Sequence, residues 1–317
     1  MVTNNNFNIT VLFGGTSSER EVSIKSAMEI APVLEKKYDL QLIELNQLNF
    51  SSFVHRIKSN SLVFNALHGG EGENGQIQSF LSQHGIVYTG SGPMASMLSM
   101  NKHFTKIIAV ENNIQTPDWL TFRFDNNNNP NMLSYKSNKK IGFPLVVKPN
   151  FQGSTLGLSV VKDRNNLDEA IKLASIYSNE VIIERFIKGR ELTVGVLGNR
   201  VLDVVEILPE SGFYDYHSKY TKGATNYISP SDISSDLTNF IKKESLKIYK
   251  AIGCRHYARV DFLLDDSSKP YLLEVNTLPG LSSTSLLPIS AKSKGINFEE
   301  LLDLIVKISI LDNDVVL

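Results

Sequence analysis

A hairpin-like segment near the end of the chain constrains the fold more than any other part of the sequence. Two strand-like runs, 259–262 and 271–276, flank the polar turn 265–270, and this pattern predicts a β-hairpin. Because side chains alternate across a strand, Arg259 and Asp261 should share one face, with apolar side chains on the other.

The second strand of this hairpin repeats the alternation. Glu274 and Asn276 should share one face, while Leu273 and Val275 lie on the opposite face. Carboxylate and amide oxygens gathered in this way suit a hard cation such as Mg²⁺, which takes its remaining ligands from water and phosphate.

The register of the two strands sharpens this expectation. If residues 265 and 270 form the last pair, Asp261 lies opposite Glu274 and Arg259 lies opposite Asn276. Two facing carboxylates repel each other unless a positive charge lies between them. A surface hairpin with solvated charges is the alternative, but the apolar opposite face and the anion-binding Arg259 favour a cation site.

Composition limits the remaining possibilities. The 317 residues can form two or three substructures, and the net charge of -1 without a basic stripe predicts no nucleic-acid partner. Cys254 is the only cysteine, so no internal disulfide is expected and a reducing compartment is favoured. We find neither signal-peptide features at residues 1–6 nor an apolar run of membrane-spanning length. We therefore expect a soluble, cytoplasmic protein with no membrane partner.

The chain changes character along its length. Strand-like and helical segments alternate over roughly the first 95 residues, which predicts a parallel α/β layer. From about residue 143 the pattern is strand-rich and α+β. Residues 209–232 are polar and aperiodic, as in a long functional loop. The clearest segments are strands at 9–13, 62–67, 86–88, 143–148, 158–162, 181–186, 191–197 and 201–208, and helices from about Ser18 and at 76–83, 101–111, 166–176, 234–252 and 298–310.

Two glycine-rich segments are candidate binding loops. The glycines at 70, 72 and 75 match a dinucleotide fingerprint in spacing, but Glu71 and Glu73 would repel a pyrophosphate, so a substrate-facing loop beside His68 is the better interpretation. The segment 152–157 is the better phosphate site. Its glycines allow backbone N–H groups to approach phosphate oxygens, and the preceding Lys148 on a buried strand requires an anion.

Two further segments contain acidic residues that could bind ligands. The run 181–187 resembles a strand leading into a hinge whose backbone could pair with a purine edge, while Glu191 could accept hydrogen bonds from ribose hydroxyls. The alternative is a pair of surface glutamates around a turn. Glu19 could equally be an ordinary acidic residue in the first turn of a helix, where Ser18 and Glu21 have capping-box spacing.

Taken together, these motifs resemble the ATP-grasp family, and within it the enzymes that join two D-alanines. No single motif is specific, but the set occurs in the family's order over almost the whole chain. The segments that carry the resemblance are 14–23, 68–75, 88–92, 148–149 with 153–154, 213–216 with 219–220, 258–261, and 273–277 with 279–280.

The resemblance implies an ATP-grasp fold preceded by a parallel α/β domain. The expected parts are an N-terminal substrate domain at 1–97, a central subdomain at 98–183, and a C-terminal subdomain at 184–317 with a lid loop at 209–232. ATP would lie between the last two parts. The family also implies a cytoplasmic homodimer that makes D-alanyl-D-alanine for peptidoglycan and releases ADP and phosphate.

The resemblance further implies a reaction through an acyl phosphate. The carboxylate of the first D-alanine attacks the γ-phosphate, and the amine of the second then displaces phosphate. Asp261, Glu274 and Asn276 would hold two Mg²⁺ ions, for which Mn²⁺ could substitute, against the β- and γ-phosphates. Arg259 and the Gly280 N–H would stabilise the tetrahedral oxyanion, an effect typically worth ~3 kcal/mol per donor.

Other residue roles also follow from the resemblance. Glu19 would bind the first alanine's ammonium group in a network with Ser154 and Tyr220, near His68, and Ser285 and Leu286 would receive the second alanine's carboxylate. Lys219 and Tyr220 would lie on a lid that keeps water from the acyl phosphate. The implied ATP contacts are Lys102, Lys148, Ser154, Glu184, Ile187, Glu191 and Lys219.

The sequence departs from the family's pattern at two places, and three rival functions stay open. Thr155-Leu156 replaces a commoner Ser-Val pair, and His256 precedes Tyr257 where a small residue is frequent; neither should disturb the sites. The rivals are a D-lactate-using variant, another ATP-grasp ligase with a different amine acceptor, and a regulatory nucleotide binder. Tyr220 argues against the first, because such relatives carry Phe there, and the intact Arg259 argues against the last.

Overall fold

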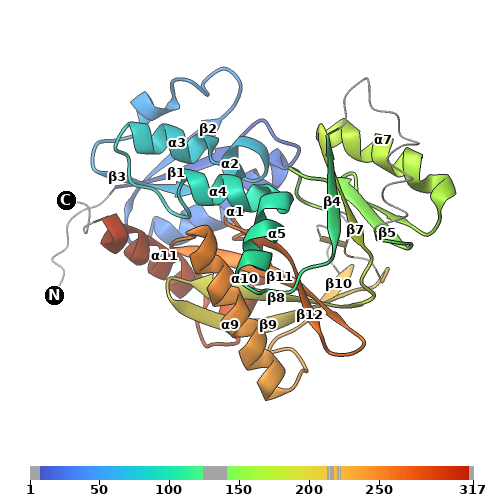
Figure 1. The fold of residues 1–317 in the computed structure, drawn as a ribbon. Coiled ribbons are helices and arrows are strands. Elements are labelled where there is room, and N and C mark those ends of the chain that lie inside the picture. The colour runs from blue at the N-terminus through green and yellow to red at the C-terminus, as the bar shows by residue number, and fades with distance from the viewer. Residues whose placement is uncertain are drawn as a thin grey trace.

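The computed structural model describes residues 8–123, 141–212, 214, 218–219, 221 and 223–313. These residues form three sheets, each with its own helices, and the sheets are distinct in Figure 1. Among the described residues, no helix is both long enough and apolar enough to span a membrane.

The first sheet is parallel, as the alternating pattern predicted, with strand order β2-β1-β3. The middle strand is a buried apolar run, whereas the edge strand β2 has mostly exposed or half-buried residues and therefore gave no sequence signal. The predicted strand at 86–88 is reduced to an isolated bridge between Val63 and Tyr88. The elements are β1 (Asn8–Gly14), α1 (Arg20–Leu34), β2 (Asp39–Leu45), the 3₁₀ helix η1 (Phe53–Arg56), β3 (Ser61–Asn65), α2 (Gly70–Glu73) and α3 (Gln76–Gln83).

The capping box predicted at the start of α1 is wrong. The helix begins at Arg20, and its N-cap residue Glu19 makes no side-chain capping hydrogen bond. The Ser17 hydroxyl accepts from the Glu19 N–H at 3.1 Å. Glu19 instead uses its carboxylate to accept a hydrogen bond from Ser154, a residue far away in the sequence.

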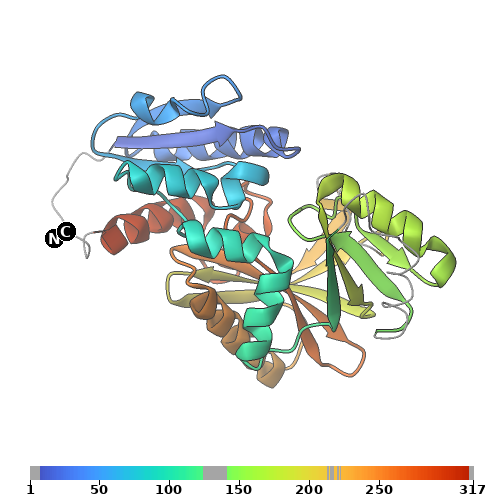
Figure 2. The ribbon, with the colours of Figure 1, turned by 45° about the horizontal axis from the view of Figure 1, so that its top comes forward.

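The last helix of the chain, α11 (Phe298–Asn313), completes the core of the first sheet. It contacts α1 and β3, and Figure 2 shows it lying along the first sheet. Leu301, Leu302, Ile305 and Val306 are fully buried in the same apolar cluster as the strand β1. The two ends of the chain therefore share one core.

The second sheet is antiparallel, with strand order β4-β7-β5-β6. Its core includes Leu167, Ala170, Ile171 and Ala174, which follow helical spacing along α7. The strands β5 and β6 pair directly, so the expected hairpin at the 152–157 loop is confirmed. The elements are β4 (Trp119–Arg123), β5 (Leu145–Pro149), β6 (Ser159–Val161), the 3₁₀ helix η2 (Arg164–Asn166), α7 (Leu167–Tyr177) and β7 (Glu180–Arg185).

The third sheet has strand order β10-β9-β8-β11-β12. One face, which carries Val260 and Phe262, is buried with α4, α5 and α9. The strand β10 lies inside the segment 209–232 that was predicted to be a loop. The elements are β8 (Gly189–Leu197), β9 (Arg200–Pro209), β10 (Thr225–Ile228), β11 (Tyr257–Asp265) and β12 (Pro270–Asn276), with α4 (Pro93–Met100), α5 (Lys102–Glu111), α9 (Ser235–Ile252) and α10 (Leu286–Lys292).

The hairpin of β11 and β12 confirms the expected pairing and corrects one detail. Asp261 lies opposite Glu274 and Arg259 lies opposite Asn276, but a bulge after Asp261 shifts the register toward the turn. One extra residue reverses the direction of the side chains that follow it. As a result Leu272 joins the core, and Leu273, which was expected there, lines a cavity instead.

His256 explains how the segment before β11 is held. It is buried and has a φ of 60°, in the left-handed region. The Gly90 N–H donates to its Nδ1 at 3.1 Å, and its Nε2 lies 3.2 Å from the Asp312 carboxylate. The ring thus ties the loop after the first sheet to α11. Burial, aided by the Arg255 charge, lowers the pKa of His256 to about 4 even though Asp312 opposes this.

We predict that His256 makes the protein sensitive to acid. In the unfolded chain the imidazole takes up a proton near pH 6.5, but in the folded protein only near pH 4. Its contribution to stability is therefore present above pH 6.5 and is lost as the pH falls toward 4, by up to about 3 kcal/mol. A His256→Asn variant tolerates the left-handed backbone but does not titrate. Urea unfolding should show the variant less stable at pH 7.5 and the gap narrower at pH 5; a gap independent of pH would contradict the assignment.

Candidate active site

Two adjoining cavities lie on the polar side of the third sheet. The inter-sheet cavity, of about 370 Å³, is lined by residues of the second and third sheets. The N-terminal cavity, of about 340 Å³, is lined by α1, the loop beside His68 and the start of α10. The residues that line both cavities are Lys102, Gly153, Ser154, Tyr214, Lys219, Arg259 and Glu274. These shared residues mark where the two spaces meet.

The inter-sheet cavity combines an apolar slot with a charged end. Val146 and Leu158 from the second sheet side, and Leu263 and Leu273 from the hairpin, give it apolar walls. It contains all of the predicted ATP contacts together with two of the three predicted metal ligands: Lys102, Lys148, Ser154, Glu184, Ile187, Glu191, Lys219, Asp261 and Glu274. An apolar slot beside clustered lysines suits a flat aromatic group joined to an anion.

Two lysines at the charged end are each paired with a carboxylate. Lys148 Nζ lies 3.0 Å from Glu184, and Lys102 Nζ lies 3.4 Å from Glu274 while donating to the Gln152 carbonyl at 2.7 Å. The anion that the buried Lys148 was expected to require is therefore Glu184 within the protein itself.

Arg259 forms the most regular of these pairs. Its Nε and Nη2 donate to the two carboxylate oxygens of Asp261 at 2.9 and 2.8 Å. The Thr193 hydroxyl donates to Asp261 Oδ1 at 2.5 Å. These bonds fix the orientation of the Asp261 carboxylate. Oδ1 accepts two of them, whereas Oδ2 accepts one and keeps a further lone pair for a ligand.

The donor set on this face fits a Mg²⁺ ion that takes most of its ligands from phosphate and water. Asp261 and Glu274 offer carboxylates from facing positions, and Asn276, on the wall of the N-terminal cavity, offers an amide oxygen that already accepts from the Leu278 N–H at 2.9 Å. Among the described residues, no cluster of three or more His, Cys, Asp or Glu side chains is suited to a metal. Two carboxylates and an amide oxygen suit a metal that is bound together with a polyanion.

The surroundings of this site shift the pKa values of two carboxyl groups in opposite directions. Burial opposes ionisation of Glu274, but Lys102, Lys219 and Lys148 outweigh it and lower the pKa to about 2. Burial, with added repulsion from Asp261 and Glu274, raises the pKa of Glu191 to about 7 despite the charge of Lys219. Glu274 is thus a permanent carboxylate, while Glu191 is poised to gain or lose a proton near neutral pH.

The hairpin loop between β5 and β6 has an unusual backbone. Ser154 and Thr155 both have positive φ values, 52° and 64°, which non-glycine residues seldom adopt. The Thr155 hydroxyl donates to the Tyr214 carbonyl at 3.0 Å, and the Ser154 hydroxyl donates to Glu19. These contacts hold the loop against both the N-terminal part of the chain and the segment that contains Tyr214.

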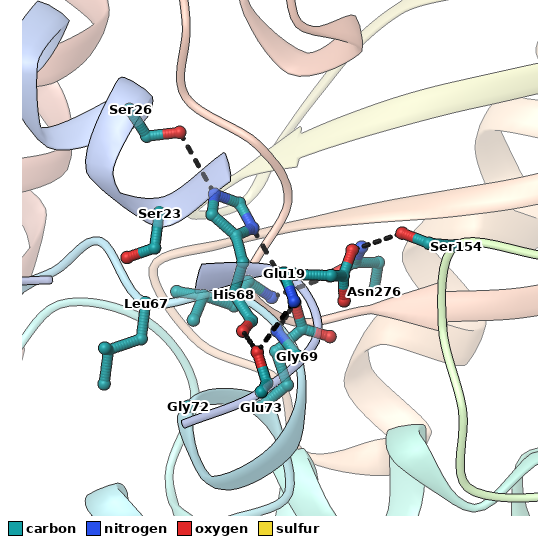
Figure 3. Close-up of polar contacts among 12 residues, drawn as sticks. Glu19, Ser23, Ser26, Leu67, His68, Gly69, Gly72, Glu73, Ser154 and Asn276 are labelled. Carbon is teal, nitrogen blue, oxygen red and sulfur yellow. Dashed lines mark hydrogen bonds and ion pairs between the residues drawn. The ribbon is translucent and has the colours of Figure 1, made fainter. Parts of the chain in front are cut away.

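In the N-terminal cavity, a polar network surrounds His68 (Figure 3). Its Nε2 lies 3.1 Å from the Ser26 hydroxyl, and its Nδ1 lies 3.8 Å from Glu73, which also accepts from the Gly69 N–H at 3.0 Å. Figure 3 shows Glu19 reaching Ser154 close to this network. The predicted partners Glu19, His68 and Ser154 are therefore brought together, while Tyr220 lies outside the described residues.

The predicted second-alanine subsite lines the far wall of the same cavity. Gly280, Ser285 and Leu286 all border it. A Cβ atom at Gly280 would come within 2.9 Å of the Ser285 hydroxyl, so the backbone of residue 280 approaches this serine closely. The Ser285 hydroxyl is 2.7 Å from that of Ser282, which fixes the start of α10.

Some residues that shape the site were missed from the sequence. Thr193 orients Asp261, and Lys106 pairs with Glu184 at 3.2 Å from beneath the cavity wall. Lys106 follows Lys102 by four positions and therefore lies on the same side of α5, which was an available signal. Nothing in the sequence near Thr193 distinguished it from an ordinary strand residue.

Comparisons with known proteins agree with this geometry. Residues 108–307 match the family model described as D-ala D-ala ligase C-terminus. Over 306 residues the chain is 39% identical to a D-alanine–D-alanine ligase of Methylacidiphilum infernorum, covering 96% of this chain and 95% of the relative.

Solved structures give the same result. A D-alanine–D-alanine ligase of Bacillus anthracis complexed with ATP superposes with a TM-score of 0.83 at 34% identity, covering 97% of this chain and 99% of that one. The VanG D-Ala:D-Ser ligase of Enterococcus faecalis superposes with a TM-score of 0.84 at 30% identity, covering 96% and 99%. The fold is therefore common to ligases whose names give different second substrates.

Proposed function

The chain belongs to the D-alanine–D-alanine ligase family, and from this premise we propose how its two cavities carry out the reaction. Members of the family form D-alanyl-D-alanine in an ATP-dependent reaction that supplies peptidoglycan synthesis. We assign ATP to the inter-sheet cavity and the two D-alanines to the N-terminal cavity. The observation that carries this assignment is the set of residues common to both cavities, including Lys102, Ser154 and Arg259.

The junction of the cavities is where bonds would form and break. A carboxylate oxygen of the first D-alanine attacks the γ-phosphorus, and the bond from that phosphorus to ADP breaks. The amine of the second D-alanine then attacks the acyl carbon, and the bond to phosphate breaks, so the products are the dipeptide, ADP and phosphate. Arg259 and the Gly280 N–H stabilise the oxyanion that forms after the amine attacks and before phosphate leaves.

Two Mg²⁺ ions, for which Mn²⁺ could substitute, are the proposed cofactors, and when bound they would supply neutralisation of the phosphate charge. Asp261, Glu274 and Asn276 would hold them. The depressed pKa of Glu274 supports this role, because a ligand must be ionised to bind a cation. Thr193 and Arg259 keep the Asp261 carboxylate in a fixed orientation.

The residues of the N-terminal cavity are the proposed contacts of the two alanines. Glu19 would accept from the first alanine's ammonium group, with Ser154, His68 and Tyr220 around it, while Ser285 and Leu286 would receive the second alanine's carboxylate. The buried position of Glu19 supports an ammonium partner.

The lid and the ATP contacts form a second part of the proposal. Lys148, Glu184, Ile187 and Glu191 would hold the nucleotide between the central part, 98–183, and the C-terminal part, 184–317. The segment 209–232 would close over it through Lys219, which lies 5.1 Å above the Tyr214 ring and borders both cavities. Closure excludes water, which would otherwise hydrolyse the acyl phosphate.

We further propose a cytoplasmic homodimer formed through α4 and α5. Large apolar side chains are exposed along these consecutive helices, namely Met94, Met97, Phe104, Ile107 and Val110. Exposed apolar patches mark association surfaces. An Ile107→Asp variant should shift the mass measured by light scattering from dimer toward monomer, whereas Leu173→Asp, at an exposed apolar position on α7, should not. A wild-type monomer would exclude the dimer.

Phosphate release from ATP, measured in parallel with D-alanine, L-alanine, D-serine and D-lactate, tests the proposed reaction. We expect release that depends on D-alanine, with D-alanyl-D-alanine as the product. Mixtures of D-alanine with D-serine or D-lactate separate the main proposal from ligases that use a different second substrate. ATP hydrolysis that ignores D-alanine would rule the proposal out.

A further inference from the structure

Lys106 is a buried cation that borders neither cavity. Its side chain is 1% exposed and projects from α5 beneath the inter-sheet cavity. The Nζ atom lies 2.7 Å from the Thr116 hydroxyl, 3.5 Å from the Pro117 carbonyl and 3.2 Å from Glu184 Oε1. A charged amine is rarely buried in this way unless it serves a neighbouring anion.

The carboxylate that Lys106 faces is only partly satisfied. Glu184 Oε2 lies 3.0 Å from Lys148 Nζ, whereas Oε1 accepts no hydrogen bond from any described residue although it is buried. The Lys106 ammonium group, 3.2 Å from Oε1, balances the charge of this oxygen and also donates to the Thr116 hydroxyl and the Pro117 carbonyl. Oε1 is thus enclosed on the Lys106 side, while the Glu184 carboxylate as a whole borders the inter-sheet cavity.

The two lysines also keep Glu184 ionised. Burial by itself would raise the pKa of Glu184, but the charges of Lys106 and Lys148 outweigh it and lower the pKa. Burial lowers the pKa of Lys106 to about 8, and Glu184 limits this shift. Both groups are therefore predominantly charged at neutral pH, and an ionised carboxylate accepts hydrogen bonds but donates none.

Thr116 connects this arrangement to the hairpin. Its hydroxyl accepts from Lys106 and donates to the Leu272 carbonyl of β12 at 2.8 Å. The position of the Lys106 ammonium group is thus set by the same strand that carries Glu274. A rigid support of this kind limits how far the Glu184 carboxylate can turn.

We propose that Lys106 is a positioning residue that gives the nucleotide site its preference for a purine with an exocyclic amine. By holding the ionised Glu184 carboxylate from beneath the cavity wall, Lys106 presents to the cavity a group that can only accept hydrogen bonds. The 6-amino group of adenine can donate to this carboxylate, whereas the 6-carbonyl of a hypoxanthine base would meet it as a second acceptor. The inference rests on the proposed binding of ATP in the inter-sheet cavity.

Comparison of ATP with inosine triphosphate tests the proposal, because adenine and hypoxanthine differ only at the edge that carries the 6-amino or 6-carbonyl group. In Lys106→Met, we expect the KM for ATP to rise about 10-fold or more, as for other outer-shell supports, with kcat at saturating ATP within about twofold of wild type. The KM for inosine triphosphate should change little, so the preference for ATP should shrink by about the same factor. Calorimetric binding of each nucleotide without D-alanine should show the same loss, and this readout does not depend on ligation.

A matched control is available at Asp203. This carboxylate is also shared by two lysines, Lys242 at 2.7 Å and Lys294 at 3.0 Å, and none of the three borders either cavity. Lys242→Met should leave the preference for ATP unchanged. Thr116→Val removes the hydroxyl that holds Lys106 but removes no charge, so it should also reduce the preference for ATP, by a smaller factor. This variant tests the proposal if Lys106→Met does not fold.

Two results would overturn the proposal. One is an equal rise in KM for both nucleotides, which would mean that Lys106 only stabilises the fold. The other is a fall in kcat with unchanged nucleotide affinity, which would place Lys106 in the chemistry of ligation. Failure of the ligase assignment would look different, because nucleotide binding would be selective for ATP while phosphate release ignored D-alanine.

Discussion

Replacing Glu274 with Gln should reduce Mg²⁺-dependent ligation by a factor on the order of 10³ or more. The substitution keeps the shape of the side chain but removes the carboxylate that Lys102, Lys219 and Lys148 keep ionised. It also removes one of the two facing charges of the hairpin, Asp261 and Glu274. Initial rates over a range of Mg²⁺ concentrations should show both a lower maximum and a higher Mg²⁺ requirement.

The same variant needs a readout that is independent of turnover. Mn²⁺ binding in the presence of a non-hydrolysable ATP analogue, followed by electron paramagnetic resonance, should weaken in Glu274→Gln. Glu206→Gln is a suitable control, since Glu206 is also a buried, ion-paired carboxylate of the third sheet but borders neither cavity. Ligation close to the wild-type rate in Glu274→Gln would remove the hairpin from the mechanism.

Replacing Arg259 with Lys should lower kcat by about 10²- to 10³-fold, which is the usual effect of losing one oxyanion donor. Lysine keeps the positive charge but cannot reproduce the fork that donates to both oxygens of Asp261 at 2.9 and 2.8 Å. The KM for ATP should change much less than kcat, because the stabilising contact forms in the transition state.

Arg190→Lys provides the matched control for this experiment. Arg190 makes a bidentate pair with Glu206, at 2.6 Å to each oxygen, on the same sheet, and neither residue lines a cavity. Loss of that fork should leave kcat nearly unchanged. If Arg259→Lys raises the KM for ATP and spares kcat, Arg259 acts through Asp261 on the ground state and is not an oxyanion donor.

The local sequence pattern was sufficient to predict those helices and strands whose burial is visible in the spacing of their own apolar residues. The buried runs of the first sheet, the helix Gln76–Gln83 and the period-two alternation of β11 could all be predicted, because each depends on burial of one face. The strands β2 and β4 were missed because most of their residues are exposed or half-buried and show no clear period, and the short helix α4 was missed as well.

The site residues divide in a similar way. Residues in motifs, such as Lys148, Ser154 and Glu274, were recognised by their order along the chain, and the structure places them around two joined cavities. Lys106 and Thr193 were not recognised. Their importance depends on contacts with Glu184 and Asp261, which are 78 and 68 residues away (106 to 184, and 193 to 261).

A polar hairpin face, a glycine- and serine-containing loop and a lysine-bearing strand could be assigned to one ATP-grasp chain from the sequence, because these features are local and occur in order. The pairing of Arg259 with Asp261, the bulge that turns Leu273 toward the cavity, and the packing of α11 against the first sheet became evident from the tertiary structure alone. The physical reason is the same for each. Ion pairs, register shifts and core packing depend on which distant residues meet, and a local sequence pattern does not contain that information.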